Sequence, residues 1–348
     1  MTVVAAPAVV DRGDQLGSPA RVRFFALAGT VVALGALCVL SVAIGSAPLS
    51  VSTVWEAVTA YDGENIDHIT VVDSRVPRTL LALLIGSALG VAGALMQAIG
   101  RNPLADPGLL GVNSGAALAV AIGVAYLGMT AISEFIWLAM IGAVLAAILV
   151  MAIAARGPSG PTPLRITLVG VALSAVFSGL AMSLSLVNPS RFERIRFWGV
   201  GSIADRPPGA VEFVAPIIAL GLLLAFAGAR SLNALALGDD AARSVGVRVG
   251  FTRTGSVFAL VLLCGAATAA AGPIAFVGLM VPHAVRMLVG VDERWVIAFS
   301  AAVGPVILLA ADLVGRLVVR PEELQVGIVT PLIGGPILIW LVRRANRL

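Results

Sequence analysis

The sequence predicts an all-α, polytopic membrane protein with about ten transmembrane helices. Of its 348 residues, 59% are hydrophobic and only 12% are charged, and the mean hydropathy is +1.02. A soluble protein of this length could not bury so much apolar surface. Apolar runs also recur at about 20 residues, the length that crosses a bilayer, and helices satisfy their own backbone groups in lipid.

Ten apolar runs are expected to span the membrane. They cover roughly 22–45, 76–99, 109–127, 131–155, 165–187, 211–231, 252–272, 274–289, 295–317 and 326–343. The first run is longer than the apolar region of a signal peptide, so we expect a retained helix. Residues 1–21 are polar and contain Pro and Gly, which predicts a partly disordered cytoplasmic tail before one transmembrane domain, 22–348.

The basic residues predict the orientation of the chain. All 23 are Arg, and the formal net charge is +4. With the N-terminus in the cytoplasm, 15 arginines fall inside and 8 fall outside. This bias predicts a multi-pass protein of the cytoplasmic membrane with both termini cytoplasmic. Because the arginines are scattered between the spans, they indicate contact with membrane lipid and no nucleic-acid partner.

Two short motifs repeat at an offset of 170 residues. PLADPGLL at 103–110 and PIAFVGLM at 273–280 share Pro, Ala, Gly and Leu at corresponding positions. In the expected topology the first copy is cytoplasmic and the second begins on the exterior side. This arrangement indicates an inverted repeat of spans 2–5 and 7–10, which commonly frames a transport pathway. Chance similarity of so short a motif is the alternative.

The second span carries Gly86, Gly90, Gly93 and Gln97 in one narrow stripe, at about 100° per residue. We expect the glycines to let another helix approach closely. An amide in lipid needs a partner or water, so Gln97 is equally compatible with an interhelical hydrogen bond and with the wall of a transport pathway.

The fifth span places four hydroxyl side chains in one line: Thr167, Ser174, Ser178 and Ser185. They are compatible with helix packing, because a hydroxyl can bond its own helix backbone, and with a mildly polar pathway wall, which the regular spacing favours slightly.

The ninth span places Asp312 four residues before Arg316 near its exterior end. This spacing lets the two side chains meet on one face of the helix. An ion pair at the membrane margin is a functional candidate, and a structural salt bridge is the alternative.

The sequence does not indicate an enzyme. It contains no Lys, which excludes a P-loop lysine and a Schiff-base lysine in this chain. Its two histidines are far apart, its two cysteines lie inside apolar runs, and no Cys–His cluster suggests a metal site.

Several long motifs resemble one family. They are RVPR at 75–78, NPLADPGLLGVNS at 102–114, GPIAFVGLMVPHAVR at 272–286, ADLVGR at 311–316 and ELQVGIVTPLIGGPILIW at 323–340. The chain resembles, from about residue 22 to its end, the permease subunits of bacterial type II ABC importers for iron–siderophores, haem and vitamin B12, often called the FecCD family.

The resemblance implies a fold and a set of partners. The fold is ten helices in each permease, and two permeases, identical or paralogous, enclose a central pathway. Two cytoplasmic ATPase subunits would bind ATP and Mg, so this chain is expected to hold no cofactor, and an extracytoplasmic binding protein would deliver the ligand. We expect a ferric siderophore or a related iron chelate as the ligand. Vitamin B12 or haem is the alternative within the family, and an ion-coupled secondary transporter is the less favoured alternative outside it.

The resemblance also assigns roles to residues at matching motif positions. Asn102 and Leu104 would belong to a cytoplasmic gate, since the loop after the second span is a gate in relatives; a plain connector is the alternative. The coupling segment, about 233–250, contains a pattern like EAA…G with Asp in place of Glu, and its candidates for contact with the ATPase are Asp240, Ala241, Ala242, Arg243 and Gly246. Arg75, Arg78 and Arg316 would receive carboxylates of the binding protein, or else anchor the helices at lipid headgroups.

Overall fold

The computed structural model describes residues 19–45, 49–129, 131–156, 162–187 and 189–345, and within these ranges the chain is helical and contains no strand. Ten apolar helices correspond one to one with the ten expected spans. They are α1 (Pro19–Ala43), α4 (Val76–Gly100), α5 (Val112–Tyr126), α6 (Ile132–Ala155), α7 (Pro163–Val187), α9 (Ala210–Ala236), α11 (Val249–Ala271), α12 (Val277–Val289), α13 (Glu293–Val318) and α14 (Val326–Ala345). Seven are long enough to cross a membrane, and α5, α12 and the apolar part of α14 are shorter. The expected fold class is confirmed.

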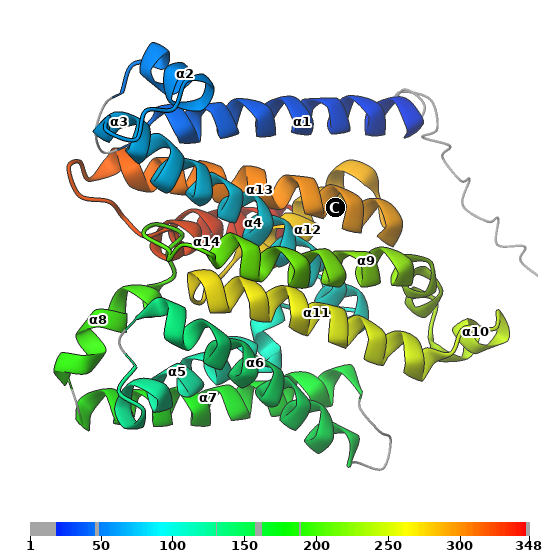
Figure 1. The fold of residues 1–348 in the computed structure, drawn as a ribbon. Coiled ribbons are helices and arrows are strands. Elements are labelled where there is room, and N and C mark those ends of the chain that lie inside the picture. Colours follow the sequence, from blue (N-terminus) through cyan, green and yellow to red (C-terminus); the bar gives the residue numbers. More distant parts are fainter. Residues whose placement is uncertain (1–18, 46–48, 130, 157–161, 188, 346–348) are drawn as a thin grey trace, which may run out of the picture.

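Most of the shorter elements lie at the two ends of the bundle, and one, a 3-10 turn, is packed among the long helices. They are α2 (Val51–Thr59), α3 (Ile66–Ile69), the π-helical η1 (Thr70–Arg75), the 3-10 turn η2 (Pro107–Leu110), α8 (Pro189–Val200) and α10 (Asp239–Ser244). Figure 1 shows α2, α3 and α8 at one end of the long helices and α10 at the other. We call these the α8 end and the α10 end. The ten expected spans do not include α2, α3 or α8.

Two expected boundaries differ in the structure. The coupling segment expected at about 233–250 is shorter, because α9 continues to Ala236 and α11 already begins at Val249. The apolar pattern ends at Ala229, but Arg230 and Asn233 extend the same helix beyond it. Of the expected tail, residues 1–18 lie outside the described residues, and α1 begins at Pro19.

The centre of the fold is α4, which packs against α13 and α12 at backbone distance. A Cβ added at Gly86 would lie 2.5 Å from Pro305 Cα, and one at Gly93 would lie 1.7 Å from the carbonyl oxygen of Gly278. Side chains larger than hydrogen therefore cannot occupy these positions without moving a neighbouring helix. The prediction that this glycine stripe serves close packing is confirmed.

The two copies of the repeated motif lie beside each other. A Cβ at Gly278 would lie 2.8 Å from Pro107 Cδ, so η2 of the first copy contacts the start of α12 in the second. The helix α5 follows the first motif and α12 begins within the second; they have 15 and 13 residues and are too short to span a bilayer alone. Each is preceded by an irregular segment packed inside the bundle, the setting in which non-helical backbone is tolerated at membrane depth.

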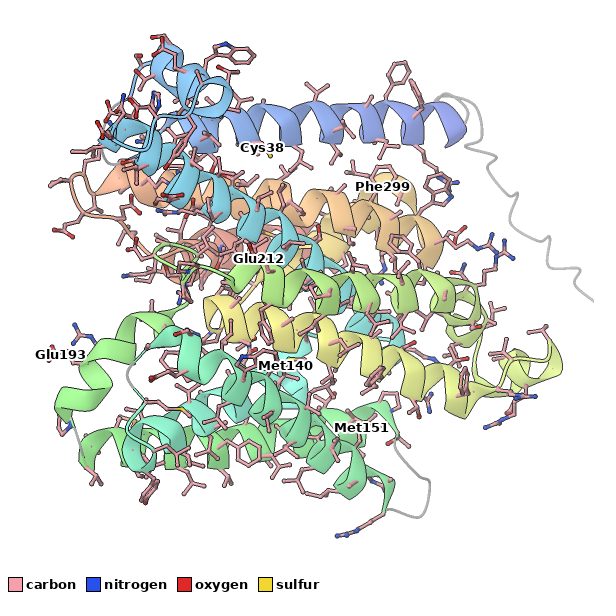
Figure 2. The ribbon with its side chains drawn as sticks, in the orientation of Figure 1. Cys38, Met140, Met151, Glu193, Glu212 and Phe299 are labelled. Carbon is pink, nitrogen blue, oxygen red and sulfur yellow. The ribbon has the colours of Figure 1, made fainter. Side chains whose placement is uncertain are left out.

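The outermost helices bury little of their surface. Only 6% of the apolar stretch of α1 and 11% of that of α7 is buried against the rest of the chain. Figure 2 shows apolar side chains projecting from α1 and α7 away from the bundle. In a membrane, such faces are covered by lipid or by another transmembrane chain.

Candidate translocation and coupling site

The loop after α4 is short, exposed and internally braced. It begins at Arg101, which has a left-handed backbone (φ 47°) and ends the helix. The side-chain oxygen of Asn102 accepts from Leu104 N at 3.0 Å, and the carbonyl of Asn102 accepts from Ala105 N at 3.1 Å. Leu104 is 44% exposed at the α10 end. Asn102 and Leu104 thus lie together on a turn whose shape is fixed by its own hydrogen bonds.

The expected short helix and Gly turn are present in the coupling segment. After α10, the amide of Gly246 donates to the carbonyl of Arg243 at 3.0 Å and that of Val247 to Ala242 at 3.0 Å. This hydrogen-bond pair is the Schellman motif, and Gly246 supplies the positive φ (83°) that it requires. Ala242 is fully buried, whereas the Asp240–Arg243 ion pair (2.7 Å) is exposed. The five candidates therefore form one protruding turn of helix, anchored by Ala242.

A charged cluster that the sequence analysis missed joins α10 to two spans. Asp239 Oδ1 lies 2.5 Å from Arg101 Nη2 and 3.3 Å from Arg253 Nη2. The same nitrogen of Arg101 also donates to the carbonyl of Leu235, at the end of α9, at 2.7 Å. Although partial burial opposes ionisation, Arg253 and Arg101 outweigh it and hold the pKa of the Asp239 carboxyl below its usual range.

Gln97 takes part in an interhelical hydrogen-bond network at the same end. It is 3% exposed, its amide donates to the carbonyl of Leu279 at 3.1 Å, and its oxygen accepts from Arg286. Arg286 also pairs with Glu293 at 3.0 Å, so the network connects α4, α12 and α13. This arrangement matches the interpretation of Gln97 as an interhelical hydrogen-bonding residue, and Gln97 also lines a cavity of about 450 Å³ beside Asn102. Arg286 and Glu293 were a signal for this network in the sequence, because they are opposite charges on either side of the turn that joins α12 to α13.

At the α8 end, two of the candidate docking arginines cap α1. Arg75 Nη1 donates to the carbonyls of Val42 (3.0 Å) and Ala43 (2.8 Å), and Arg316 Nη1 donates to those of Ser41 (2.7 Å) and Ile44 (2.9 Å). These carbonyls end a helix that has no basic residue in its own last turn.

The exposed fractions of these two arginines are 5% and 1%. We expected Arg75 and Arg316 to be available to a partner's carboxylates. In this arrangement each would first have to release carbonyls of α1.

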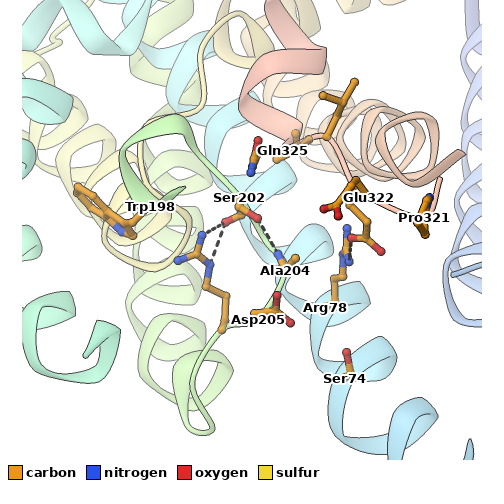
Figure 3. Close-up of a pocket in the computed structure, with 13 residues that line it drawn as sticks. Ser74, Arg78, Trp198, Ser202, Ala204, Asp205, Pro321, Glu322 and Gln325 are labelled. Atoms are coloured by element: carbon orange, nitrogen blue, oxygen red, sulfur yellow. Dashed lines mark hydrogen bonds and ion pairs between the residues drawn. The ribbon is translucent and has the colours of Figure 1, made fainter. Parts of the chain in front are cut away.

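Arg78 lies at the wall of a polar cavity. It pairs with Asp312 and Glu323, both at 2.7 Å, and Asp312 also pairs with Arg316 on its own helix, as the four-residue spacing predicted. The cavity has a volume of about 540 Å³ and is also lined by Arg206. Figure 3 shows Arg78 on one side of it and Ser202 on the other. Burial lowers the pKa of Arg206 to about 10.

The hydroxyl line of α7 has mixed surroundings. Thr167 and Ser185 donate to backbone carbonyls of their own helix at 3.1 and 2.6 Å, and Ser178 is exposed. Ser174 Oγ would lie 3.7 Å from a Cβ at Gly111, so it faces the start of α5. Ser185 also lines an open, mostly apolar cavity of about 650 Å³ between α5, α7 and α8.

Ten apolar helices with two copies of a repeated motif in contact at their centre, a protruding helix at one end and a charged cavity at the other define a multi-pass membrane permease. The chain belongs to the FecCD transport family, whose sequence profile it matches over residues 33–344.

Named relatives and a solved structure agree with this assignment. The chain is 44% identical to the ferric enterobactin transport system permease protein FepD of Escherichia coli (strain K12), with 95% of this chain and 98% of the relative covered. It is 40% identical to the iron(3+)-hydroxamate import system permease protein FhuB of Bacillus subtilis (strain 168), with 91% and 84% covered. A metal-chelate type ABC transporter solved in an inward-facing conformation superimposes with a TM-score of 0.80 at 28% identity, with 94% and 99% covered.

Proposed function

We propose that this chain is the permease subunit of an ABC importer that moves a ferric siderophore or a related iron chelate across the cytoplasmic membrane. The observation that carries the proposal is α10, a short, partly exposed helix held between Gly238 and Gly246, at the end of a FecCD-type bundle. A protruding helix of this kind suits a groove on a second protein. The chain contains no Lys and so has no P-loop lysine, and we therefore assign ATP hydrolysis to that separate subunit and a non-enzymatic role to this chain.

The proposed assembly has partners at both ends. Two ATPase subunits, which hold ATP and Mg, bind at the α10 end on the cytoplasmic side, and both termini of this chain are cytoplasmic. A second permease, identical or paralogous, completes the pathway, and lipid covers the remaining apolar faces. The iron-chelate substrate is supported by the two relatives reported above, which are named for ferric enterobactin and iron(3+)-hydroxamate, whereas a relative of lower identity (34%) is named as a hemin permease.

The proposed pathway follows the poorly buried face of α7. The cavity beside Ser185 and the hydroxyls of Thr167, Ser174 and Ser178 offer a mildly polar wall there, while Asn102 and Leu104 form the gate at the α10 end. We leave Gln97 out of this wall because its amide is already bonded on both sides.

The extracytoplasmic binding protein is proposed to dock at the α8 end. Arg78 is the arginine best situated to meet a partner's carboxylate there, since it borders the open cavity. Arg75 and Arg316 support this surface by holding α1 against it. Exposed Asp205 and Glu322 at the cavity rim add charge that would set the orientation of the partner.

The test is to purify the chain in mild detergent from its native host and identify the proteins that co-purify. An ATPase and an extracytoplasmic binding protein are expected. Quenching of the intrinsic fluorescence of that binding protein by ferric siderophores, haem and vitamin B12 then identifies the substrate. A binding protein that responds to haem or vitamin B12 alone would contradict the iron-chelate proposal, and the absence of an ATPase would contradict the importer class.

A further inference from the structure

We infer that the Arg101–Asp239 ion pair is the connection through which α10 moves the loop 102–104, so that these two residues are positioning residues for coupling. This inference rests on the proposed function, because it needs α10 to be displaced by an ATPase. The two residues are separated by 138 positions in sequence, and in the structure they are joined by a 2.5 Å contact.

The backbone conformation of Arg101 is unfavourable for an arginine, which indicates that its side-chain contacts matter. It is one of three non-glycine residues with positive φ in the described part of the chain, and it occupies the C-terminal cap of α4. Glycine or asparagine adopts this conformation at a lower cost in free energy. An arginine at this position therefore makes the end of α4 less stable, and its side-chain contacts offset that loss. Those contacts are with Leu235 O and with Asp239, at the junction of α9 and α10.

The helix α10 is built to move as a unit. Gly238 (φ 111°) precedes it and Gly246 (φ 83°) follows it, and both glycines have open space around them. Among the described residues, the ion pairs that tie α10 to other helices are those of Asp239 with Arg101 and with Arg253. A displacement of α10 therefore acts on α4 and α11 through Asp239, in addition to the buried apolar contact of Ala242.

The loop beyond Arg101 is stiff enough to transmit a displacement. Asn102 N donates to the carbonyl of Gln97, the Asn102 side chain accepts from Leu104 N, and Pro103 restricts the backbone between them. Arg253 anchors the opposite side of Asp239, on α11, which keeps the carboxylate directed at α4. Movement of Asp239 thus shifts Arg101, and Arg101 shifts Leu104 with it.

The test measures the loop directly in the complete complex with its co-purifying ATPase in nanodiscs. A reporter cysteine replaces Leu104 in a Cys38→Ala/Cys264→Ala background, and its labelling rate by a water-soluble maleimide is measured with and without ATP and Mg. We expect the rate in the reporter chain to depend on nucleotide. Arg101→Gln and Asp239→Asn should each reduce that dependence by about twofold to fivefold, the range for a partly exposed ion pair.

The double variant should show no greater reduction than the larger of the two single effects, because each single variant already removes the Arg101–Asp239 contact. Arg156→Gln, at an exposed arginine that ends α6 on the same side, is the matched control and should respond like the reporter chain. The ATPase should co-purify equally with all variants, which separates a lost connection from a lost partner.

Three outcomes would overturn the inference: an unchanged nucleotide response in both single variants, additive effects in the double variant, or a reporter chain that binds ATPase but shows no nucleotide response. If the reporter chain retains no ATPase, the proposed function fails and the inference fails with it.

Discussion

Replacing Asp312 by Asn tests whether the buried charge cluster at the α8 end holds α1, α4 and α13 together. The Asp312 side chain is 2% exposed and accepts hydrogen bonds from Arg78 and Arg316. The substitution keeps the shape of the side chain but removes its charge, so the buried guanidinium of Arg316 loses its counter-ion. Breaking a buried pair in this way costs about 3–5 kcal/mol.

Thermal unfolding in detergent, followed by tryptophan fluorescence, measures the effect. With an unfolding entropy of about 2.1 cal/mol/K per residue over the chain, that loss lowers Tm by about 4–7 °C. Asp240→Asn is the matched control, because it removes a carboxylate from the exposed Asp240–Arg243 pair, and its Tm should stay within about 1 °C of wild type. Equal shifts in the two variants would refute the assignment of a structural charge cluster at Asp312.

Three further substitutions test other parts of the account. Gly93→Ala places a methyl group against a backbone carbonyl of α12 and should destabilise the protein by about 1–3 kcal/mol. Gly35→Ala, on the open face of α1, is the control and should not destabilise it. Equal stability of the two variants in detergent would contradict the close packing of α4 on α12. Gly246→Arg forces a positive φ on arginine and obstructs the exposed turn, so the chain should reach the membrane but retain less ATPase on purification; undiminished co-purification would speak against α10 as the coupling element. Because Asp239 has a lowered folded-state pKa, the Tm advantage of wild type over Asp239→Asn should be constant from about pH 8 to 5 and shrink as pH falls below about 3.9; an advantage that disappears near neutral pH would refute the assigned shift.

The spans could be predicted because each depends on local composition. A run of about 20 apolar residues meets the bilayer requirement wherever it lies in the chain, and all ten runs became helices. The close packing at Gly86 and Gly93 could also be predicted from the sequence, since a helix places residues four and seven positions apart on one face. The resemblance of the motifs to the FecCD family was also confirmed by the family match.

The ionic contacts could not be predicted because they depend on which helix ends come together. Arg316 caps carbonyls near Ser41, 275 positions away in sequence, and nothing in the local sequence around Arg316 identifies that partner. The same holds for Arg101 and Asp239. The four-residue spacing did predict the Asp312–Arg316 pair, because that contact lies within one helix.

The roles proposed for Asn102, Leu104 and Gly246 come from motif resemblance and remain predictions. Their conformations, a braced loop and a protruding turn, agree with these roles. The α8 helix was missed for a different reason: PSRFERIRFWGV is rich in arginine and has no long apolar run, so hydropathy does not identify it.

Uptake of a ⁵⁵Fe-labelled chelate into proteoliposomes tests whether this chain is the permease of an ATP-driven iron-chelate importer. The vesicles contain this chain with its co-purified permease partner, with or without the ATPase. The binding protein is loaded with the chelate that quenches its fluorescence and is added on the side of the α8 end. The account predicts accumulation only when the ATPase, ATP and Mg are present. Accumulation without the ATPase, driven by a proton or sodium gradient, would contradict it and would place the chain among secondary transporters.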